Sequence, residues 1–238
     1  MAYFRREINS PDAMLEIGQQ RDSSAQLLHF FGFNPAVSTT YETIWNNGGG
    51  QYVYPSQALT MSCVSTSADD TQTILISGLD EDYEEIYDIV QLSGTTPVTT
   101  TNQFYRINAA RTLAGVNVGA ISISNSGTVY AYIGPDLGTH QTTFYTVPAG
   151  RSLYIHQVTF NSGTVNPNKY MTARGSIISS TGVENRFWQS TFQQDVYFNL
   201  RVPFIVREKT DFLIEAKSSS GENELSIYMG AVLLEDYV

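Results

Sequence analysis

Short runs of alternating apolar and polar side chains constrain this chain most, and they continue from about residue 39 to the C-terminal end. The runs are rich in Thr, Ser, Val, Ile and Tyr, and turn-forming residues separate them at intervals of about 8 to 15 positions. Successive side chains of a strand point to opposite faces of a sheet, so this period of two indicates half-buried strands. The sequence therefore predicts an all-β fold, an antiparallel β-sandwich or jelly roll.

Four pairs of these runs flank turn signals, and we expect each pair to form a hairpin. They join residues 74–79 to 86–92, 121–123 to 129–133, 144–147 to 153–160, and 212–216 to 225–229. Gly, Pro, Asn and Ser in the connections, as in Asn125-Ser126-Gly127 and Pro148-Ala149-Gly150, favour tight turns.

The first 40 residues lack this alternation, and we expect them to form a short, partly helical N-terminal arm. Ser10 and Pro11 are typical of a helix start, and one or two turns can follow as far as Gly18. A very apolar stretch at 23–33 then ends at Asn34-Pro35. This stretch packs either on its own domain or on a neighbouring subunit.

We assign residues 1–40 to the arm and residues 41–238 to one sandwich. Gly48-Gly49-Gly50 lies near this boundary, and a split near residue 135 into two smaller sandwiches is the alternative. Beta domains of about 200 residues are common, which favours the single sandwich.

Charge and cysteine content exclude several classes of protein. The net charge is −10, and residues 22–105 hold ten acidic side chains and no basic one. Such a chain lacks the basic patch that binding to a phosphate backbone needs, so we expect no nucleic-acid partner. No apolar run is long enough to span a bilayer, no secretory signal is recognisable, and the single Cys63 permits no intrachain disulfide.

No catalytic or cofactor motif is recognisable, so we assign no catalytic residue, no cofactor and no metal ligand. The three histidines, His29, His140 and His156, have no partner by pattern. The acidic run 80–85, preceded by Asp69-Asp70, is best explained as a solvated turn. Calcium binding or the paired carboxylates of a glycan hydrolase are its alternatives. We expect a protein that is not an enzyme.

Aromatic residues beside amides and glycines offer a second possibility. Trp45, Tyr52 and Tyr54 lie near Asn46-Asn47 and three glycines, a composition typical of loops that stack on sugar rings. Burial in the sandwich is the commoner fate of Trp and Tyr, so the core interpretation is favoured and glycan contact is kept as the alternative.

Composition also indicates assembly into a symmetric homo-oligomer. Only 15% of residues are charged, and the chain has ten arginines against three lysines. Arginine is enriched and lysine depleted at protein interfaces. An apolar arm together with a polar sandwich fits a closed assembly of identical subunits.

Several segments resemble a family of small virion structural proteins of tailed phages, particularly those of marine cyanobacteria. They are W45-N-N-G-G-G-Q-Y-V-Y-P55, D69-D-T71, S77-G-L-D-E-D-Y-E-E85, V90-Q-L-S-G-T-T-P-V98, F104-Y-R-I-N108, G119-A-I-S-I123 and Y145-T-V-P-A-G150, with a weaker match over 203–211. The resemblance implies a non-enzymatic protein of the virion, a trimeric capsid decoration or cement protein that contacts the major capsid protein or other virion proteins. It carries no catalytic residue over.

In this interpretation the arm anchors the protein to the shell or to adjacent copies. The candidate contact residues are Arg5, Arg6, Leu27, Leu28, Phe30 and Phe31. A chain truncated before residue 40 is then expected to fold and to lose capsid binding. The alternative is a tail-associated receptor-binding or fibre module that contacts host glycans through Trp45, Tyr52 and Tyr54.

Overall fold

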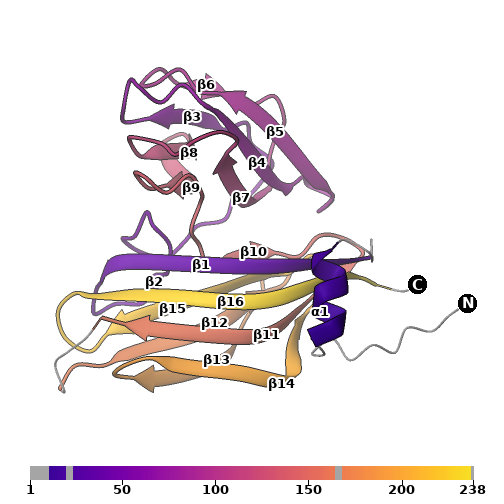
Figure 1. Cartoon of the computed structure of the whole chain (residues 1–238), viewed down its shortest axis with the longest axis vertical. Helices are drawn as coiled ribbons and strands as arrows, with labels where there is room; N and C mark the ends of the chain where they lie inside the picture. The colour runs from indigo at the N-terminus through magenta and orange to yellow at the C-terminus, as the bar shows by residue number, and fades with distance from the viewer. Residues whose placement is uncertain (1–10, 20–23, 164–167, 237–238) are drawn as a thin grey trace, which may run out of the picture.

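A computed structural model describes residues 11–19, 24–163 and 168–236 of the chain. The predicted all-β class is confirmed: in these residues sixteen strands form antiparallel sheets, and the one helix is α1 (Pro11–Gly18). The strands belong to four sheets in two units, which Figure 1 shows one above the other, instead of to one sandwich. No helix among the described residues is long and apolar enough to cross a membrane.

The larger unit, here called the body, contains two sheets built from both ends of the chain. The first sheet has the order β1-β16-β11-β14, and the second has the order β10-β15-β12-β13 with β2 also paired to β15. Their bounds are β1 (Ala25–Val37), β2 (Glu42–Thr43), β10 (Phe144–Thr146), β11 (Arg151–Ser162), β12 (Met171–Ile178), β13 (Glu184–Phe192), β14 (Val196–Val206), β15 (Asp211–Ser218) and β16 (Asn223–Glu235).

Alternation of side chains explains why these two sheets pack face to face. Along β16, the buried Leu225, Ile227 and Met229 alternate with half-exposed Ser226 and Tyr228. The apolar face of each sheet contributes to a single buried cluster, so burial of apolar surface holds the two sheets together.

The smaller unit, here called the inserted unit, spans residues 45–142 and has a second apolar cluster. Its sheets have the orders β6-β3-β8-β9 and β5-β4-β7. The strands are β3 (Ser62–Ser65), β4 (Thr73–Leu79), β5 (Glu85–Gln91), β6 (Val98–Thr99), β7 (Arg106–Thr112), β8 (Ile121–Asn125) and β9 (Thr128–Ile133).

The inserted unit interrupts one edge of the body between β2 and β10. Both strands pair with β15, through Thr43 opposite Glu215 and Phe144 opposite Leu213. The backbone N–H of Thr143 donates to the carbonyl of Ile44 at 3.2 Å, so the insertion begins and ends at touching positions. The chain therefore crosses between the units twice, near residues 44 and 143, rather than once near residue 135.

The apolar stretch of the expected arm is an integral strand of the body. The helix forms where the sequence indicates, at Pro11–Gly18, but β1 pairs with β16 from Ala25 opposite Leu234 to Val37 opposite Asn223. Residues 25–37 thus pack on their own domain, the first of the two alternatives above. A chain cut before residue 40 would lose a whole strand of the body, so we now expect such a chain not to fold.

Two of the four expected hairpins form, and two do not. β4 pairs with β5, and β8 pairs with β9 around Ser126 and Gly127, both at positive φ. The runs on either side of Pro148-Ala149-Gly150 lie in different sheets, as do β15 and β16 on either side of residues 219–222. These two predictions were wrong because the turns are corners that carry the chain from one sheet to the other.

Candidate functional site

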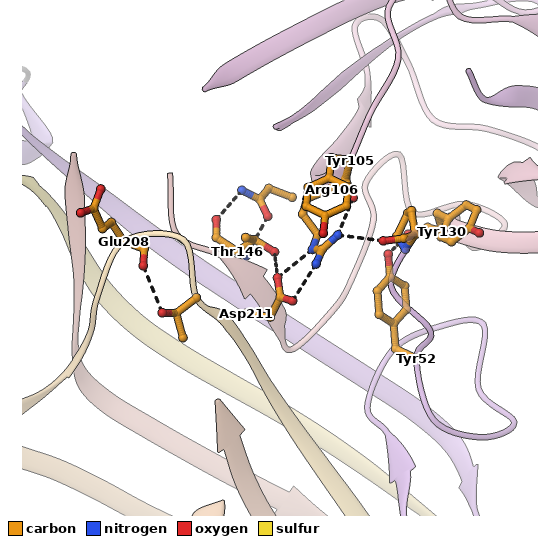
Figure 2. Close-up of polar contacts among 10 residues, drawn as sticks. Tyr52, Tyr105, Arg106, Tyr130, Thr146, Glu208 and Asp211 are labelled. Carbon is orange, nitrogen blue, oxygen red and sulfur yellow. Dashed lines mark hydrogen bonds and ion pairs between the residues drawn. The ribbon is translucent and has the colours of Figure 1, made fainter. Parts of the chain in front are cut away.

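The two units meet at a buried ion pair between the first residue of β7 and the first residue of β15. Arg106 Nε donates to Asp211 Oδ1 at 2.8 Å, and its Nη2 donates to Asp211 Oδ2 at 3.0 Å. Both side chains are almost completely buried. Figure 2 shows this pair at the junction, with Arg106 coming from the inserted unit and Asp211 from the body.

Further hydrogen bonds satisfy the remaining polar atoms of the pair. Arg106 Nη1 donates to the carbonyls of Pro55 at 3.1 Å and Tyr105 at 2.8 Å, and Thr146 Oγ1 donates to Asp211 Oδ1 at 2.6 Å. Asn108 exchanges two hydrogen bonds with the backbone of Thr146, at 2.8 and 2.9 Å. The guanidinium carbon also lies 3.9 Å from the ring centroid of Tyr105.

The electrostatics of this junction favour a permanent contact. Burial by itself lowers the pKa of Arg106, but the hydrogen bonds and the charge of Asp211 outweigh it and raise that pKa above its usual value. A buried, two-pronged guanidinium–carboxylate pair is directional, so it fixes how the inserted unit sits on the body. Its hydrogen bonds join residues of the two units, which makes it a positioning contact between them.

Sequence reasoning missed both residues of the ion pair. Arg106 and Asp211 each lie within a segment that carries the phage resemblance, Phe104–Asn108 and residues 203–211. Arg106 is also the first basic residue after the base-free stretch 22–105. The position of Arg106 as a single basic residue beside aromatic ones could have indicated its role, because arginine is the preferred cation for buried ion pairs and stacks on aromatic rings.

The aromatic residues proposed for glycan contact lie in the core of the inserted unit. Trp45 is 5% exposed and Tyr52 is 8% exposed, while Tyr54 is half-buried against the same cluster. The Tyr52 ring stacks on Phe144 with centroids 3.8 Å apart, and its hydroxyl donates to the carbonyl of Tyr130 at 3.0 Å. Burial raises the pKa of Tyr52 and that of Tyr54. Trp45 and Tyr52 therefore present no face to a sugar ring, and the core interpretation holds.

The candidate contact residues of the arm differ from one another in exposure. Phe30 is buried, Leu28 packs against the body's core, and Leu27 is half-buried beside Gly18 of α1. Phe31 points the opposite way from Phe30 and is 55% exposed, with its ring 5.1 Å from that of Tyr228. Of these four side chains, Phe31 is the exposed one; Arg5 and Arg6 lie outside the described residues.

A cavity of about 440 Å³ separates β1 from the inserted unit. Its lining includes Leu28, Phe30 and Phe31 of β1 and mixes apolar side chains with polar ones such as His29, Glu85 and Asn108. Part of the expected contact set thus faces the chain's own inserted unit.

The acidic run forms an internally bonded turn between β4 and β5. Asp80 Oδ1 accepts from the backbone N–H groups of Asp82 at 2.9 Å and Glu84 at 3.0 Å, and Glu81 accepts from Ala58 N–H at 3.0 Å. Glu85 pairs with Arg151 of the body at 3.3 Å. Among the described residues no three His, Cys, Asp or Glu side chains gather in an arrangement that could hold a metal ion.

Asp70, ten positions before that run in the sequence, has a separate structural role. Its buried carboxylate accepts from Ser65 Oγ, from the backbone N–H groups of Val118 at 2.7 Å and Gly119 at 2.8 Å, and from Gln72. Burial alone would raise the pKa of Asp70, but these hydrogen bonds outweigh it and the net pKa is lowered. The carboxylate ties the loop before β8 to the end of β3.

The histidines are engaged in packing and hydrogen bonding. His140 is half-buried and accepts from the backbone N–H of Tyr132 at 3.0 Å, and removal of its ring from water lowers its pKa to about 3. His29 lies 3.0 Å from the hydroxyl of Tyr228, and the pKa of His156 is lowered by burial and by the nearby His29.

Comparisons with known proteins give only remote likenesses. No protein-family model and no curated protein matches the chain. A structure of infectious bursal disease virus, Gt strain, is 13% identical with a TM-score of 0.22, over 90% of this chain and 69% of that one. The VP2 subviral particle of the same virus is 10% identical with a TM-score of 0.18, over 95% and 82% of the two chains.

Proposed function

We propose that this chain is a non-enzymatic structural protein of a bacteriophage virion, of the capsid decoration or cement type. Its partners would be further copies of itself, expected as a homotrimer, and the major capsid protein or another virion protein. The resemblance of the segments between residues 45 and 150 supports this class of protein.

The strand order of the body is the observation that carries the proposal. The order β1-β16-β11-β14 facing β10-β15-β12-β13 supports the expected jelly roll when β2 and β10 are taken as two parts of one interrupted strand. Jelly rolls are a common architecture of viral capsid proteins and of lectins. Fold alone does not decide between those roles, and the sequence resemblance favours the virion.

The buried ion pair at the junction also fits a particle protein that is under mechanical stress. Arg106 and Asp211 hold the inserted unit against the body through two hydrogen bonds in a buried setting. A protein that holds neighbouring capsomers together must transmit force between its two units without a change in their relative orientation. Many weak contacts repeated by symmetry would then supply the affinity for the shell.

Co-sedimentation of the full chain with empty shells of the virus that encodes it tests the proposal. Saturable binding is expected, with the protein also present in purified particles by mass spectrometry. Absence from the particles, together with no binding to shells, would contradict it.

Charge reversal at Arg5 and Arg6, and a Phe31→Ser substitution, test the assigned contacts. Each is expected to reduce shell binding, because it removes a candidate cation or an exposed ring on the β1 side of the body. Val53→Ser is the matched control, since Val53 is 63% exposed in the inserted unit and is not among the residues that line the cavity beside Phe31. An equal loss of shell binding in the control variant would show that the loss does not depend on where the substitution lies.

A further inference from the structure

The cavity between β1 and the inserted unit is bordered by three separate parts of the chain. One is β1 of the body, the second is the sheet β5-β4-β7 of the inserted unit, and the third is the segment 139–142 that leads back to β10. Figure 1 shows β1 as the strand of the body that runs below the inserted unit. With about 440 Å³, the cavity lies within the usual size of small-molecule sites, about 300–1,000 Å³.

Two exposed aromatic rings stand at the mouth of this cavity, one from each unit. Phe31 of β1 is 55% exposed and Tyr87 of β5 is 65% exposed, although both line the cavity. The Phe31 ring packs at 5.1 Å from the ring of Tyr228, which restricts its movement. Exposed rings on two sides of one opening offer surfaces on which the apolar face of a ligand can stack.

Small side chains leave room beside Tyr87. Ser77 of β4 lies opposite Tyr87 on one side and opposite Ala109 of β7 on the other, so the three side chains form one row across the sheet. All three line the cavity. A ligand that stacks on the tyrosine can therefore also reach the surface of the sheet.

Four polar side chains around the cavity have no hydrogen-bond partner within the described part of the chain. They are those of Gln26, Ser77, Thr139 and Gln141. They come from β1, β4 and the segment 139–142, so amide and hydroxyl groups border the space on three sides. An extended peptide pairs with a continuous row along one strand, whereas groups distributed around a space suit a compact ligand.

The charges of the lining disfavour an anionic ligand. No lysine or arginine is among the described residues that line the cavity, Glu85 is its one carboxylate, and His140 stays neutral because its pKa is about 3. Anions are held most strongly by charged donors such as arginine and lysine. A purely apolar ligand is disfavoured as well, because it would leave the amide and hydroxyl groups without partners.

We propose that this cavity is a binding site for a neutral saccharide, which is held between Phe31 and Tyr87. A sugar ring has an apolar face of C–H groups and a rim of hydroxyl groups, so one ligand matches both the aromatic rings and the polar side chains. The site is separate from Trp45 and Tyr52, whose rings are buried. The inference does not depend on the proposed place of the protein on a virion.

An array of immobilised neutral oligosaccharides, probed with the labelled full chain, tests the site. We expect saturable binding to at least one neutral glycan, and weaker binding when a uronic acid replaces a neutral sugar of that glycan, because no cation lines the cavity. Absence of binding to every neutral glycan, or a preference for the acidic ones, would overturn the inference.

Tyr87→Ala locates the binding in this cavity. Calorimetry with the neutral glycan that binds best is expected to show an affinity about tenfold lower, since the stacking surface is lost. Tyr197→Ala is the matched control, because Tyr197 is 58% exposed but lies on β14 and does not line the cavity. Both side chains are exposed, so both variants should fold, and equal affinities in the two would contradict the proposed site.

Shell binding by Tyr87→Ala separates this inference from the proposed function. Phe31 lines the cavity and is also an assigned shell contact, whereas Tyr87 belongs to the cavity alone. We expect Tyr87→Ala to lose affinity for the glycan and to keep its binding to shells. A variant with unchanged glycan affinity would overturn the saccharide site and leave the virion role as it stands.

Discussion

Arg106 and Asp211 are 105 positions apart in the sequence, yet their side chains meet head-on at 2.8 and 3.0 Å between two separate apolar cores. Both side chains are buried, and they form further hydrogen bonds with Thr146, Pro55 and Tyr105. Breaking such a pair leaves an uncompensated charge inside the protein, so the junction is sensitive to single substitutions.

Replacing Arg106 by alanine is expected to lower the free energy of unfolding by about 3–5 kcal/mol, because Asp211 then remains buried without its partner. Chemical denaturation followed by fluorescence measures the loss. Arg186→Ala is the matched control: its pair with Glu184 is exposed, and such pairs contribute about 0–1 kcal/mol. Similar losses in the two variants would contradict the structural role of the junction.

Stability should fall in acid in a way that depends on Asp70. Its pKa is lowered in the folded protein, so the unfolded chain binds the proton more readily. The stabilisation is therefore present above the ordinary carboxyl pKa and is lost as the pH drops through the folded value. Unfolding free energies of the wild type and Asp70→Asn, measured from pH 6 to pH 2, should converge at the acid end.

The exposed neighbour Asp69 provides the control for this pH dependence. Asp69→Asn is expected to follow the wild-type curve, because only the side chain of Asp70 accepts from Val118 and Gly119. An acid-induced loss that survives in Asp70→Asn would place its origin in other groups.

A methyl group at Gly78 should disrupt the approach of β4 to β7. A Cβ there would meet the backbone carbonyl of Arg106 and would lie 2.8 Å from the ring of Phe104. Gly78→Ala is expected to cost about 1–3 kcal/mol or more, because the obstacle is backbone and cannot rotate away. Ser77→Ala, one position earlier on β4, should change thermal stability little, and an equally stable Gly78→Ala would show that the ladder can shift.

Adjacent phenylalanines on β1 should respond in opposite ways to truncation. Phe30→Ala leaves a void in the body's core and is expected to cost about 3–5 kcal/mol, whereas Phe31→Ala lies on the exposed face and should change stability by about 0.5 kcal/mol or less. Urea denaturation of the two variants measures the difference. Equal effects would mean that β1 does not pack as described.

Cys63 should be unreactive in the native protein. Burial raises the pKa of its thiol to about 12, and the reactive thiolate is therefore scarce at neutral pH. A thiol reagent is expected to modify it only after unfolding by denaturant. Rapid labelling of the folded chain would show that β3 opens readily.

The sequence predicted local features well and long-range ones poorly. The alternation identified strands, and Asn125-Ser126-Gly127 identified a true hairpin because its residues suit positive φ. Pro148-Ala149-Gly150 looks equally turn-like, but the strands around it go to different sheets. A tight corner and a hairpin share the same turn chemistry, so only tertiary packing separates them.

The site was less predictable for a related reason. Composition favoured burial of Trp45 and Tyr52 but left glycan contact as an alternative, because their burial depends on Phe144, which is about a hundred residues away in the sequence. The apolar stretch before Asn34-Pro35 looked like an arm because its partner β16 lies at the far end of the chain. Neither partnership leaves a trace in local periodicity.

The backbones of Ile44 and Thr143 are hydrogen-bonded where the inserted unit leaves and rejoins the body. That unit is therefore an insertion whose two ends adjoin within a single interrupted strand. A module with adjoining ends can replace it without stretching β2 or β10, provided that the module shields Phe144 and Leu213 and supplies a cationic partner for Asp211. The inserted unit can then vary in sequence, or be exchanged for another domain, while the two-sheet body stays unchanged.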